Sequence, residues 1–295
     1  MSIARPGAAS RPWHRCNGPY AVRVARDAAL RAGIWYQAQV NALIAAIGYL
    51  FVIALIGISL PIQAVIFAVT APFDPSRLAA GRYLRWVGRR IADCYPPWKL
   101  RVEGSWPAAG GAFVVVSNHQ SILDILLMSR MPREMKWIAK EELFGVPWIG
   151  WMLRMSGDIA IRRGAKESGL EALGRARDHL ARGVPVMVFP EGTRSRDGRL
   201  LPFKSGAFRL AIEAGVPILP VAVNGTGAGM PKGGPWVRPC EAFARILEPI
   251  PTAGLKPEDA VRLKETVRRR IAAELPGGLS VSPKAEPAAD SPDAL

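Results

Sequence analysis

The chain has 295 residues, 49% of them hydrophobic, and its 39 Lys and Arg residues exceed its 24 Asp and Glu residues, giving a formal net charge of +15. This length allows one or two domains with a sizeable core. The charge favours a nucleic acid or an anionic membrane surface as partner, and we predict no nucleic-acid partner because no nucleic-acid-binding motif is evident. The three cysteines lack metal-ligand or disulfide spacing, so we expect no metal site and a catalytic part that lies in the cytoplasm.

The N-terminal region joins a basic arm to a long apolar interval. Residues 1–31 form the basic arm, and no charged residue occurs from Ala32 to Phe73. One bilayer crossing takes about 20 residues, so residues 32–74 can hold one tilted span or two shorter segments. Pro61 favours a break in the second half. Since arginines flank both ends of the interval, we expect a membrane-embedded helical hairpin in the inner (cytoplasmic) membrane, with a buried soluble helix pair as the alternative.

Residues 75–97 show an amphipathic helical pattern. Arg82, Arg85 and Arg89 follow one helical face, whereas Leu84 and Val87 follow another. This pattern predicts an interfacial helix on an anionic membrane surface, and an ordinary amphipathic core helix is the alternative.

Residues 98–275 alternate short apolar runs with helical patterns, which predicts an α/β fold with a mostly parallel central sheet flanked by helices. The expected strands lie near residues 112–117, 135–139, 158–161, 184–189, 217–223 and 242–247. The expected helices cover residues 121–131, 146–155, 166–181, 205–214 and 257–274. The composition after Pro276 is rich in Gly, Pro, Ser, Ala and Asp, so we expect residues 276–295 to be a disordered tail.

Two of the predicted strands lead into polar segments. The first is followed by His119 and Asp124, and the strand near residues 184–189 is followed by Glu191 and Arg194. In open α/β sheets, reactive groups gather beyond the carboxyl ends of the strands. If both strands run parallel in one sheet, these side chains emerge at the same edge. We therefore expect a site there.

His119 is the candidate base of this site. A neutral imidazole, with a reference pKa of about 6.5, suits removal of the proton from an alcohol that attacks a thioester. Asp124 is the candidate carboxylate that would fix the tautomer. On one continuous helix these residues would lie roughly 140° apart, so we expect His119 in the loop before a helix and Asp124 in its first turns. No Ser-His or Cys-His nucleophile is evident, which favours direct attack by the acceptor hydroxyl.

The second polar segment suits recognition of a phosphate. Arg194 can hold a phosphate by charge-assisted hydrogen bonds, and Gly192 lets the backbone approach it closely. Thr193 and Glu191 can bind further acceptor oxygens or brace Arg194. Each motif taken alone also fits a simpler explanation, namely a structural histidine or a turn with a solvated arginine.

Four blocks, in this order, resemble the glycerolipid acyltransferases typified by 1-acylglycerol-3-phosphate acyltransferase. They are the His-x4-Asp motif of residues 119–124, residues 140–163, residues 189–195 and the apolar residues 216–221. The resemblance implies that His119 is the base and Asp124 its orienting partner. It also implies an acceptor-phosphate site that contains Arg194 and Arg163. Arg162 stands where the family commonly has Asp, which leaves the acceptor open.

The resemblance further implies a membrane-bound O-acyltransferase whose catalytic domain faces the cytoplasm. The acyl donor would be acyl-CoA or acyl-carrier protein, the acceptor 1-acylglycerol-3-phosphate and the product phosphatidate, with no cofactor. One alternative is an acyltransferase for another lyso-lipid, such as lyso-ornithine lipid. The other is a catalytically inactive, anionic-lipid-binding membrane protein.

Overall fold

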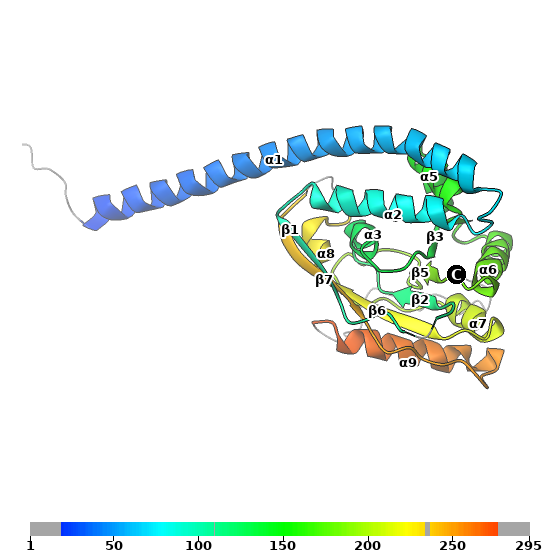
Figure 1. Ribbon diagram of the computed structural model, residues 1–295. Coiled ribbons are helices and arrows are strands. Elements are labelled where there is room, and N and C mark those ends of the chain that lie inside the picture. Colours follow the sequence, from blue (N-terminus) through cyan, green and yellow to red (C-terminus); the bar gives the residue numbers. More distant parts are fainter. Residues whose placement is uncertain (1–18, 109, 234–236, 277–295) are drawn as a thin grey trace, which may run out of the picture. The chain divides into compact units, whose positions relative to one another are not determined.

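The computed structural model describes residues 19–108, 110–233 and 237–276 (Figure 1). The predicted tail therefore lies outside the described residues except for Pro276, and so does much of the basic arm. The chain falls into two compact units, residues 1–47 and 48–295. Helix α1 spans Pro19–Thr70, and its N-terminal part makes up the described residues of the first unit. Large apolar side chains of this part, such as Trp35 and Leu43, are exposed.

Helix α1 takes the place of the expected hairpin, because it continues through Pro61. The break predicted there is therefore wrong. Pro61 has no N–H to donate to the carbonyl of residue 57. However, the following turn is fixed from outside the helix, since the buried Gln63 Nε2 donates to the carbonyls of Ala80 at 3.2 Å and Met152 at 3.0 Å. By length and composition, Leu30–Thr70 is a candidate membrane span.

Within the described residues, seven strands form one sheet in the order β1-β7-β6-β2-β5-β3-β4. The strands are β1 Trp98–Glu103, β2 Val114–Ser117, β3 Lys136–Lys140, β4 Ile159–Ile161, β5 Val186–Val188, β6 Ile218–Asn224 and β7 Cys240–Ile246. All neighbouring pairs are parallel except β6 with β7, which confirms the mostly parallel sheet.

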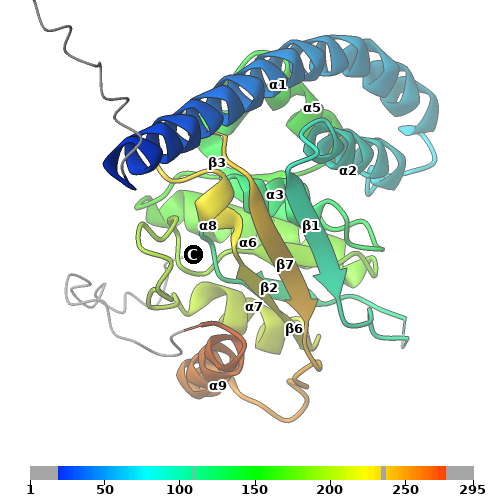
Figure 2. The same cartoon turned by 90° about the vertical axis from the view of Figure 1, so that its left-hand side faces the viewer.

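Helices cover both faces of this sheet, as the two views show (Figures 1 and 2). The helices after α1 are α2 Leu78–Asp93, α3 Leu123–Met128, α4 Glu141–Phe144, α5 Ile149–Ser156, α6 Lys166–Ala181, α7 Gly206–Glu213, α8 Thr226–Gly229, the 3-10 helix η1 Pro257–Asp259 and α9 Ala260–Ala273. Alternate residues of β2 point to opposite faces. Val115 packs in the cluster that contains Leu127 of α3, whereas Val116 packs in the cluster that contains Val267 of α9.

Helix α2 does not present the expected row of arginines to its surroundings. Arg82 and Arg89 are exposed, but the side chain of Arg85 is only 12% exposed. It donates to Asp158 and lies 3.7 Å from Glu134. Because α2 packs on other helices and buried carboxylates need partners, Arg85 turns inward, and the prediction of an exposed basic stripe is wrong at this position.

Candidate active site

The neighbouring parallel strands β6, β2 and β5 end at the same edge of the sheet. Asn118, the first residue after β2, is clamped to β6. Its Nδ2 donates to the carbonyl of Val223 at 2.8 Å, and its Oδ1 accepts the N–H of Val223 at 2.8 Å. Since both ends of the amide bind one residue of β6, the clamp fixes the direction in which the chain leaves the sheet.

His119 follows this clamp in the loop before α3, and Asp124 lies in the first turn of α3. The His119 Nδ1 and Asp124 Oδ2 atoms are 2.7 Å apart, and the Asp124 carboxylate is fully buried. The loop between them supplies the change of direction that a continuous helix would not allow. The structure therefore brings the two residues together as the spacing argument expected.

The remaining partners of Asp124 indicate which nitrogen of the neutral imidazole carries the hydrogen. Asp124 Oδ2 also accepts the N–H groups of Gln120 at 2.7 Å and Ser121 at 3.0 Å, while Oδ1 accepts the Thr226 hydroxyl. With acceptor atoms engaged in this way, Asp124 is an acceptor toward His119 as well, so Nδ1 carries the hydrogen. This leaves Nε2 with a lone pair, which is the atom that a general base uses.

The imidazole is held on its face as well as at its edge. It stacks on the Phe189 ring with centroids 4.1 Å apart and planes 17° from parallel. Phe189 follows β5 directly, so the apolar end of that strand supports the base. Only 8% of His119 is exposed, which limits competition from water at the ring.

Glu191 is buried against the loop that carries His119. Its Oε1 accepts the N–H of His119 at 2.9 Å, and its Oε2 accepts the N–H of Leu201 at 3.3 Å. Burial raises the pKa of Glu191 to about 8, against the lowering effect of these two hydrogen bonds. Among the described residues Glu191 forms no ion pair with Arg194. It instead ties the loop after β2 to the loops after β5.

The rest of the segment after β5 carries backbone turns and cations. Gly192 has a φ of +65°, in the left-handed region that favours glycine. Lys232 Nζ donates to Thr193 Oγ1 at 3.1 Å and to the carbonyl of Arg194 at 2.8 Å. Within the part of the chain that the structure describes, the Arg194 guanidinium has no hydrogen bond or ion pair, so it is free to bind an anion.

These cations are close enough to repel one another. Burial lowers the pKa of Lys232, and repulsion from Arg196, Arg194 and Arg163 lowers it further. Burial and repulsion from Arg194 likewise lower the pKa of Arg163, although Glu142 opposes them. Arg163, two residues after β4, is thus near enough to Arg194 for their charges to repel. A bound anion would relieve this repulsion.

Arg162, the position that departs from the family pattern, is engaged elsewhere. Its Nε donates to Glu141 Oε2 at 2.6 Å and its Nη2 to Glu141 Oε1 at 3.2 Å. These two bonds hold the exposed Arg162 side chain against Glu141, the first residue of α4. The departure therefore adds no further free cation beside Arg194.

Two contributors to the site were missed in the sequence. Thr226 binds Asp124 from a position 102 residues away, and Lys232 reaches Arg194 from 38 residues away. Both follow β6, the strand that adjoins β2. The signal that could have found them is the expected parallel sheet, since polar residues after a third neighbouring strand belong to the same edge.

Comparison with known proteins gives the class of this fold and site. Residues 99–224 match the model of the acyltransferase family. The chain is 37% identical over 190 residues to the chloroplast 1-acyl-sn-glycerol-3-phosphate acyltransferase of Arabidopsis thaliana, covering 62% of this chain and 53% of the relative. It is 36% identical over 228 residues to a 1-acyl-sn-glycerol-3-phosphate acyltransferase of Chlamydomonas reinhardtii, covering 74% of this chain and 66% of the relative.

A solved structure extends the match over more of the fold. The crystal structure of the 1-acyl-sn-glycerophosphate acyltransferase PlsC from Thermotoga maritima superposes with a TM-score of 0.64 at 31% identity, covering 79% of this chain and 95% of that chain. The chain belongs to the 1-acyl-sn-glycerol-3-phosphate acyltransferase family. This confirms the resemblance drawn from the four blocks. The chain spans about half to two thirds of the length of the curated relatives above.

Proposed function

We propose that this protein transfers a fatty acyl group from acyl-CoA or acyl-carrier protein to the free hydroxyl of 1-acylglycerol-3-phosphate, forming phosphatidate. The observation that carries the proposal is a histidine bonded to a buried carboxylate at the same sheet edge as Arg194, whose guanidinium has no partner among the described residues. Acyl transfer to an alcohol that carries a phosphate requires a base for the hydroxyl proton and a binding site for the phosphate. The relatives named for this reaction support the same acceptor.

In the proposed reaction, His119 Nε2 takes the proton of the acceptor hydroxyl as its oxygen attacks the thioester carbon. The imidazolium that forms is stabilised by the Asp124 carboxylate at 2.7 Å. The tetrahedral intermediate then collapses, the carbon–sulfur bond breaks, and Nε2 returns the proton to the thiolate. An ester and a free thiol result, and His119 regains its starting state without an acyl-enzyme.

The remaining predicted residues fall into three roles. Arg194 and Arg163 bind the acceptor phosphate, while Gly192 and Thr193 shape the loop that presents Arg194. Glu191 acts as a positioning residue, because its carboxyl group accepts the N–H of His119 at 2.9 Å and touches no cation of this cluster among the described residues. Held in this way, the base and the phosphate site keep a fixed separation during turnover.

We also propose that the protein attaches to the inner membrane through α1, with its catalytic domain in the cytoplasm. In residues 48–70, one face of α1 is anchored by Gln63, whereas Ile58, Ile62 and Val65 are exposed. Exposed Trp148, the residue before α5, and Trp151 of α5 are typical of a membrane interface. Basic flanks before and after the apolar interval favour both of its ends on the cytoplasmic side, so that the continuous helix α1 lies along the membrane surface without crossing it.

Thiol labelling in intact cells tests this topology. In a variant whose three native cysteines are replaced, single cysteines at Ser10 and Ser282 should both resist a membrane-impermeant reagent and both react after permeabilisation. Labelling of the Ser10 site alone in intact cells would establish a single crossing and overturn the proposed topology.

The reaction itself is tested with purified full-length protein. Thiol release from acyl-CoA should depend on added 1-acylglycerol-3-phosphate, and mass spectrometry should find phosphatidate. An acyl-carrier-protein arm identifies the donor. Activity with lyso-ornithine lipid but not with 1-acylglycerol-3-phosphate would change the acceptor assignment. Absence of acceptor-dependent thiol release with both donors and every lyso-lipid would contradict the proposal.

A further inference from the structure

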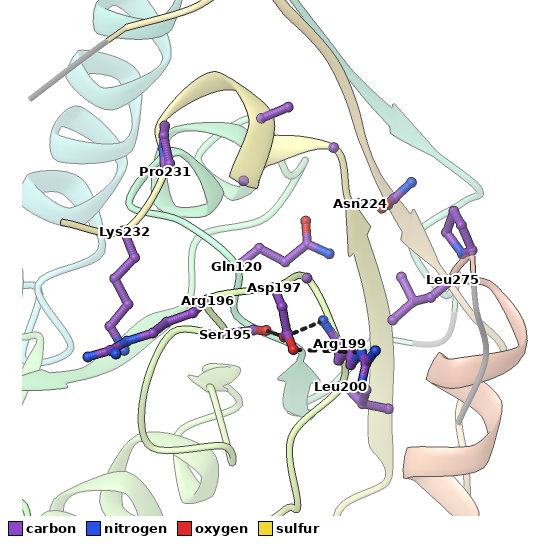
Figure 3. A pocket seen from close by; sticks show the side chains of 15 residues that line it. Gln120, Ser195, Arg196, Asp197, Arg199, Leu200, Asn224, Pro231, Lys232 and Leu275 are labelled. Carbon is purple, nitrogen blue, oxygen red and sulfur yellow. Dashed lines mark hydrogen bonds and ion pairs between the residues drawn. The ribbon is translucent and has the colours of Figure 1, made fainter. Parts of the chain in front are cut away.

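A pocket opens beside the proposed base on the side of the sheet edge nearer α9. Its volume is about 560 Å³, which falls within the range of small-molecule sites. Its walls are residues 195–200 after β5, residues 224, 225, 227 and 228 at the end of β6 and the start of α8, residues 231–232, and residues 275–276 after α9 (Figure 3). Gln120 also lines it.

The pocket shares a wall with the active site. Gln120 is the residue after His119, and the N–H of Ser195 donates to the carbonyl of His119 at 2.8 Å. A ligand in the pocket therefore lies along the loop that holds the base. The side chain of His119 does not line the pocket, so the pocket adjoins the reacting centre and extends away from it.

The charge in the pocket is unbalanced. Among the described residues that line it, Arg196, Arg199 and Lys232 supply three cations against the single carboxylate of Asp197, a net excess of two positive charges. Asp197 already accepts the Ser195 hydroxyl at 3.1 Å and lies 3.6 Å from Arg199 Nε. Figure 3 shows the side chains of Arg196 and Lys232 reaching toward the same point, and repulsion from Arg196 contributes to the lowered pKa of Lys232. Such a pocket fits a polyanionic ligand.

Its position separates it from the proposed membrane side. Helix α2 and residues 48–70 of α1 lie on one side of the sheet, whereas α9, whose C-terminal end borders the pocket, lies over the other face (Figures 1 and 2). The lipid acceptor resides in the membrane, but an acyl-CoA donor presents a water-soluble nucleotide. The pocket is thus placed for the soluble end of the donor.

We propose that this pocket binds the nucleotide end of acyl-CoA, with Arg196, Arg199 and Lys232 as partners for its phosphates. The 3′-phosphate alone carries about −1.5 to −2 charges near neutral pH, which matches the excess of positive charge. The pantetheine arm then runs past Gln120 toward His119. The assignment rests on the proposed function, because it takes a thioester as the acyl donor.

The test compares two variants with a matched control in the purified full-length protein. Arg196→Ala and Arg199→Ala should each raise the KM for acyl-CoA roughly tenfold or more, since a charge-assisted hydrogen bond to phosphate is lost. The KM for 1-acylglycerol-3-phosphate should not change. Arg133→Ala removes an exposed arginine that precedes β3, at the opposite end of the strands from the site, and should leave both constants unchanged.

Two further arms identify the ligand. The wild type should have a higher KM for 3′-dephospho-acyl-CoA than for acyl-CoA. With the dephosphorylated donor, the KM values of the two variants should lie much closer to that of the wild type. Binding of unacylated CoA, measured by calorimetry, should weaken in both variants and not in Arg133→Ala. Matching thermal unfolding curves show that the variants are folded, and Arg196→Gln replaces Arg196→Ala if they do not match.

Three results would overturn the assignment. The first is an unchanged donor KM in both variants, and the second is a rise in the KM for the lipid acceptor instead. The third is a wild type that uses 3′-dephospho-acyl-CoA or acyl-carrier protein as well as acyl-CoA, because the pocket would then not recognise the nucleotide. A wild type that binds CoA through Arg196 and Arg199 but transfers no acyl group would contradict the proposed function while leaving the CoA site intact.

Discussion

The loop that carries His119 and the loop that carries Arg194 lie at the same sheet edge, yet they differ in how fully their polar groups are bonded. Around His119 the groups are saturated: Asp124 alone accepts bonds from the ring, two backbone N–H groups and a hydroxyl. Around Arg194 the cations repel one another, and its guanidinium has no partner within the described residues.

This difference separates groups that must be positioned from groups that must bind. The base needs one tautomer and one orientation before the substrate arrives, and a satisfied hydrogen-bond network provides them at little reorganisation cost. A phosphate site is favoured by a cation without a partner, because a salt bridge within the protein would have to rearrange before the ligand could bind. The predictions below test this division in order of expected effect.

Asp124→Asn should produce the largest loss, because the amide cannot accept hydrogen bonds with both of its polar atoms and the ring loses its tautomer. We expect kcat to fall by about 10²- to 10⁴-fold. Steady-state thiol release with 1-acylglycerol-3-phosphate measures it. Asp93→Asn, which removes an exposed carboxylate outside the site, is the matched control. A near wild-type rate in Asp124→Asn would remove this carboxylate from the mechanism.

Glu191 should make stability depend on pH. Its folded-state pKa is about 8 against an ordinary value of 4.5, so the unfolded chain releases this proton first as the pH rises. The stability associated with the neutral carboxyl group is complete below about pH 4.5 and is lost as the pH rises toward 8. The loss is at most about 1.4 kcal/mol per pH unit.

Glu191→Gln should flatten this dependence, because the amide does not ionise. Urea unfolding of wild type and variant at several pH values between 5 and 8 measures the difference. The variant should gain relative stability as the pH rises. Parallel curves for the two proteins across that range would show that Glu191 ionises normally in the fold.

Arg194→Ala should act on binding rather than on the chemical step. We expect the KM for 1-acylglycerol-3-phosphate to rise by about 10- to 100-fold through loss of charge-assisted hydrogen bonds. Arg194→Lys should recover little, because an ammonium group lacks the planar fork of a guanidinium. An unchanged acceptor KM in Arg194→Ala would place the phosphate elsewhere.

The smallest expected difference is between alanine substitutions of the adjacent residues Arg162 and Arg163, measured as acceptor KM. Arg163→Ala should raise the acceptor KM, by less than Arg194→Ala, because Arg163 lies near Arg194 but also near Glu142. Arg162→Ala should leave acceptor KM and melting temperature unchanged, since its exposed side chain pairs with Glu141. Equal effects of the two substitutions on acceptor KM would contradict the division between them.

Local patterns in the sequence predicted most of the sheet and the His119–Asp124 pair. Strand β2, for example, is a run of buried valines, and the five-residue spacing of the pair requires a loop. By contrast β1 was missed, because Trp98–Glu103 alternates apolar and charged residues at the edge of the sheet. A short alternating run before the first glycine-rich turn gives a weaker signal than a continuous apolar run.

The errors share a physical cause, which is partners that lie far away in the sequence. Pro61 predicts a break from local geometry, but Gln63 is held by Met152, 89 residues later. Arg85 belongs to a charged face in the helical pattern, but Asp158 pairs with it inside the fold. In the same way, Thr226 and Asn118 acquire their roles only when β6 lies beside β2. Such pairings follow from topology and not from neighbouring residues.

The most direct test of the account is the rate of acyl transfer by His119→Ala. The variant should keep the thermal unfolding curve of the wild type at a pH where Glu191 is protonated, and it should bind CoA equally well. Its kcat for phosphatidate formation from acyl-CoA and 1-acylglycerol-3-phosphate should fall by about 10²- to 10⁴-fold. A folded His119→Ala protein that forms phosphatidate at the wild-type rate would contradict the central claim that His119 is the base.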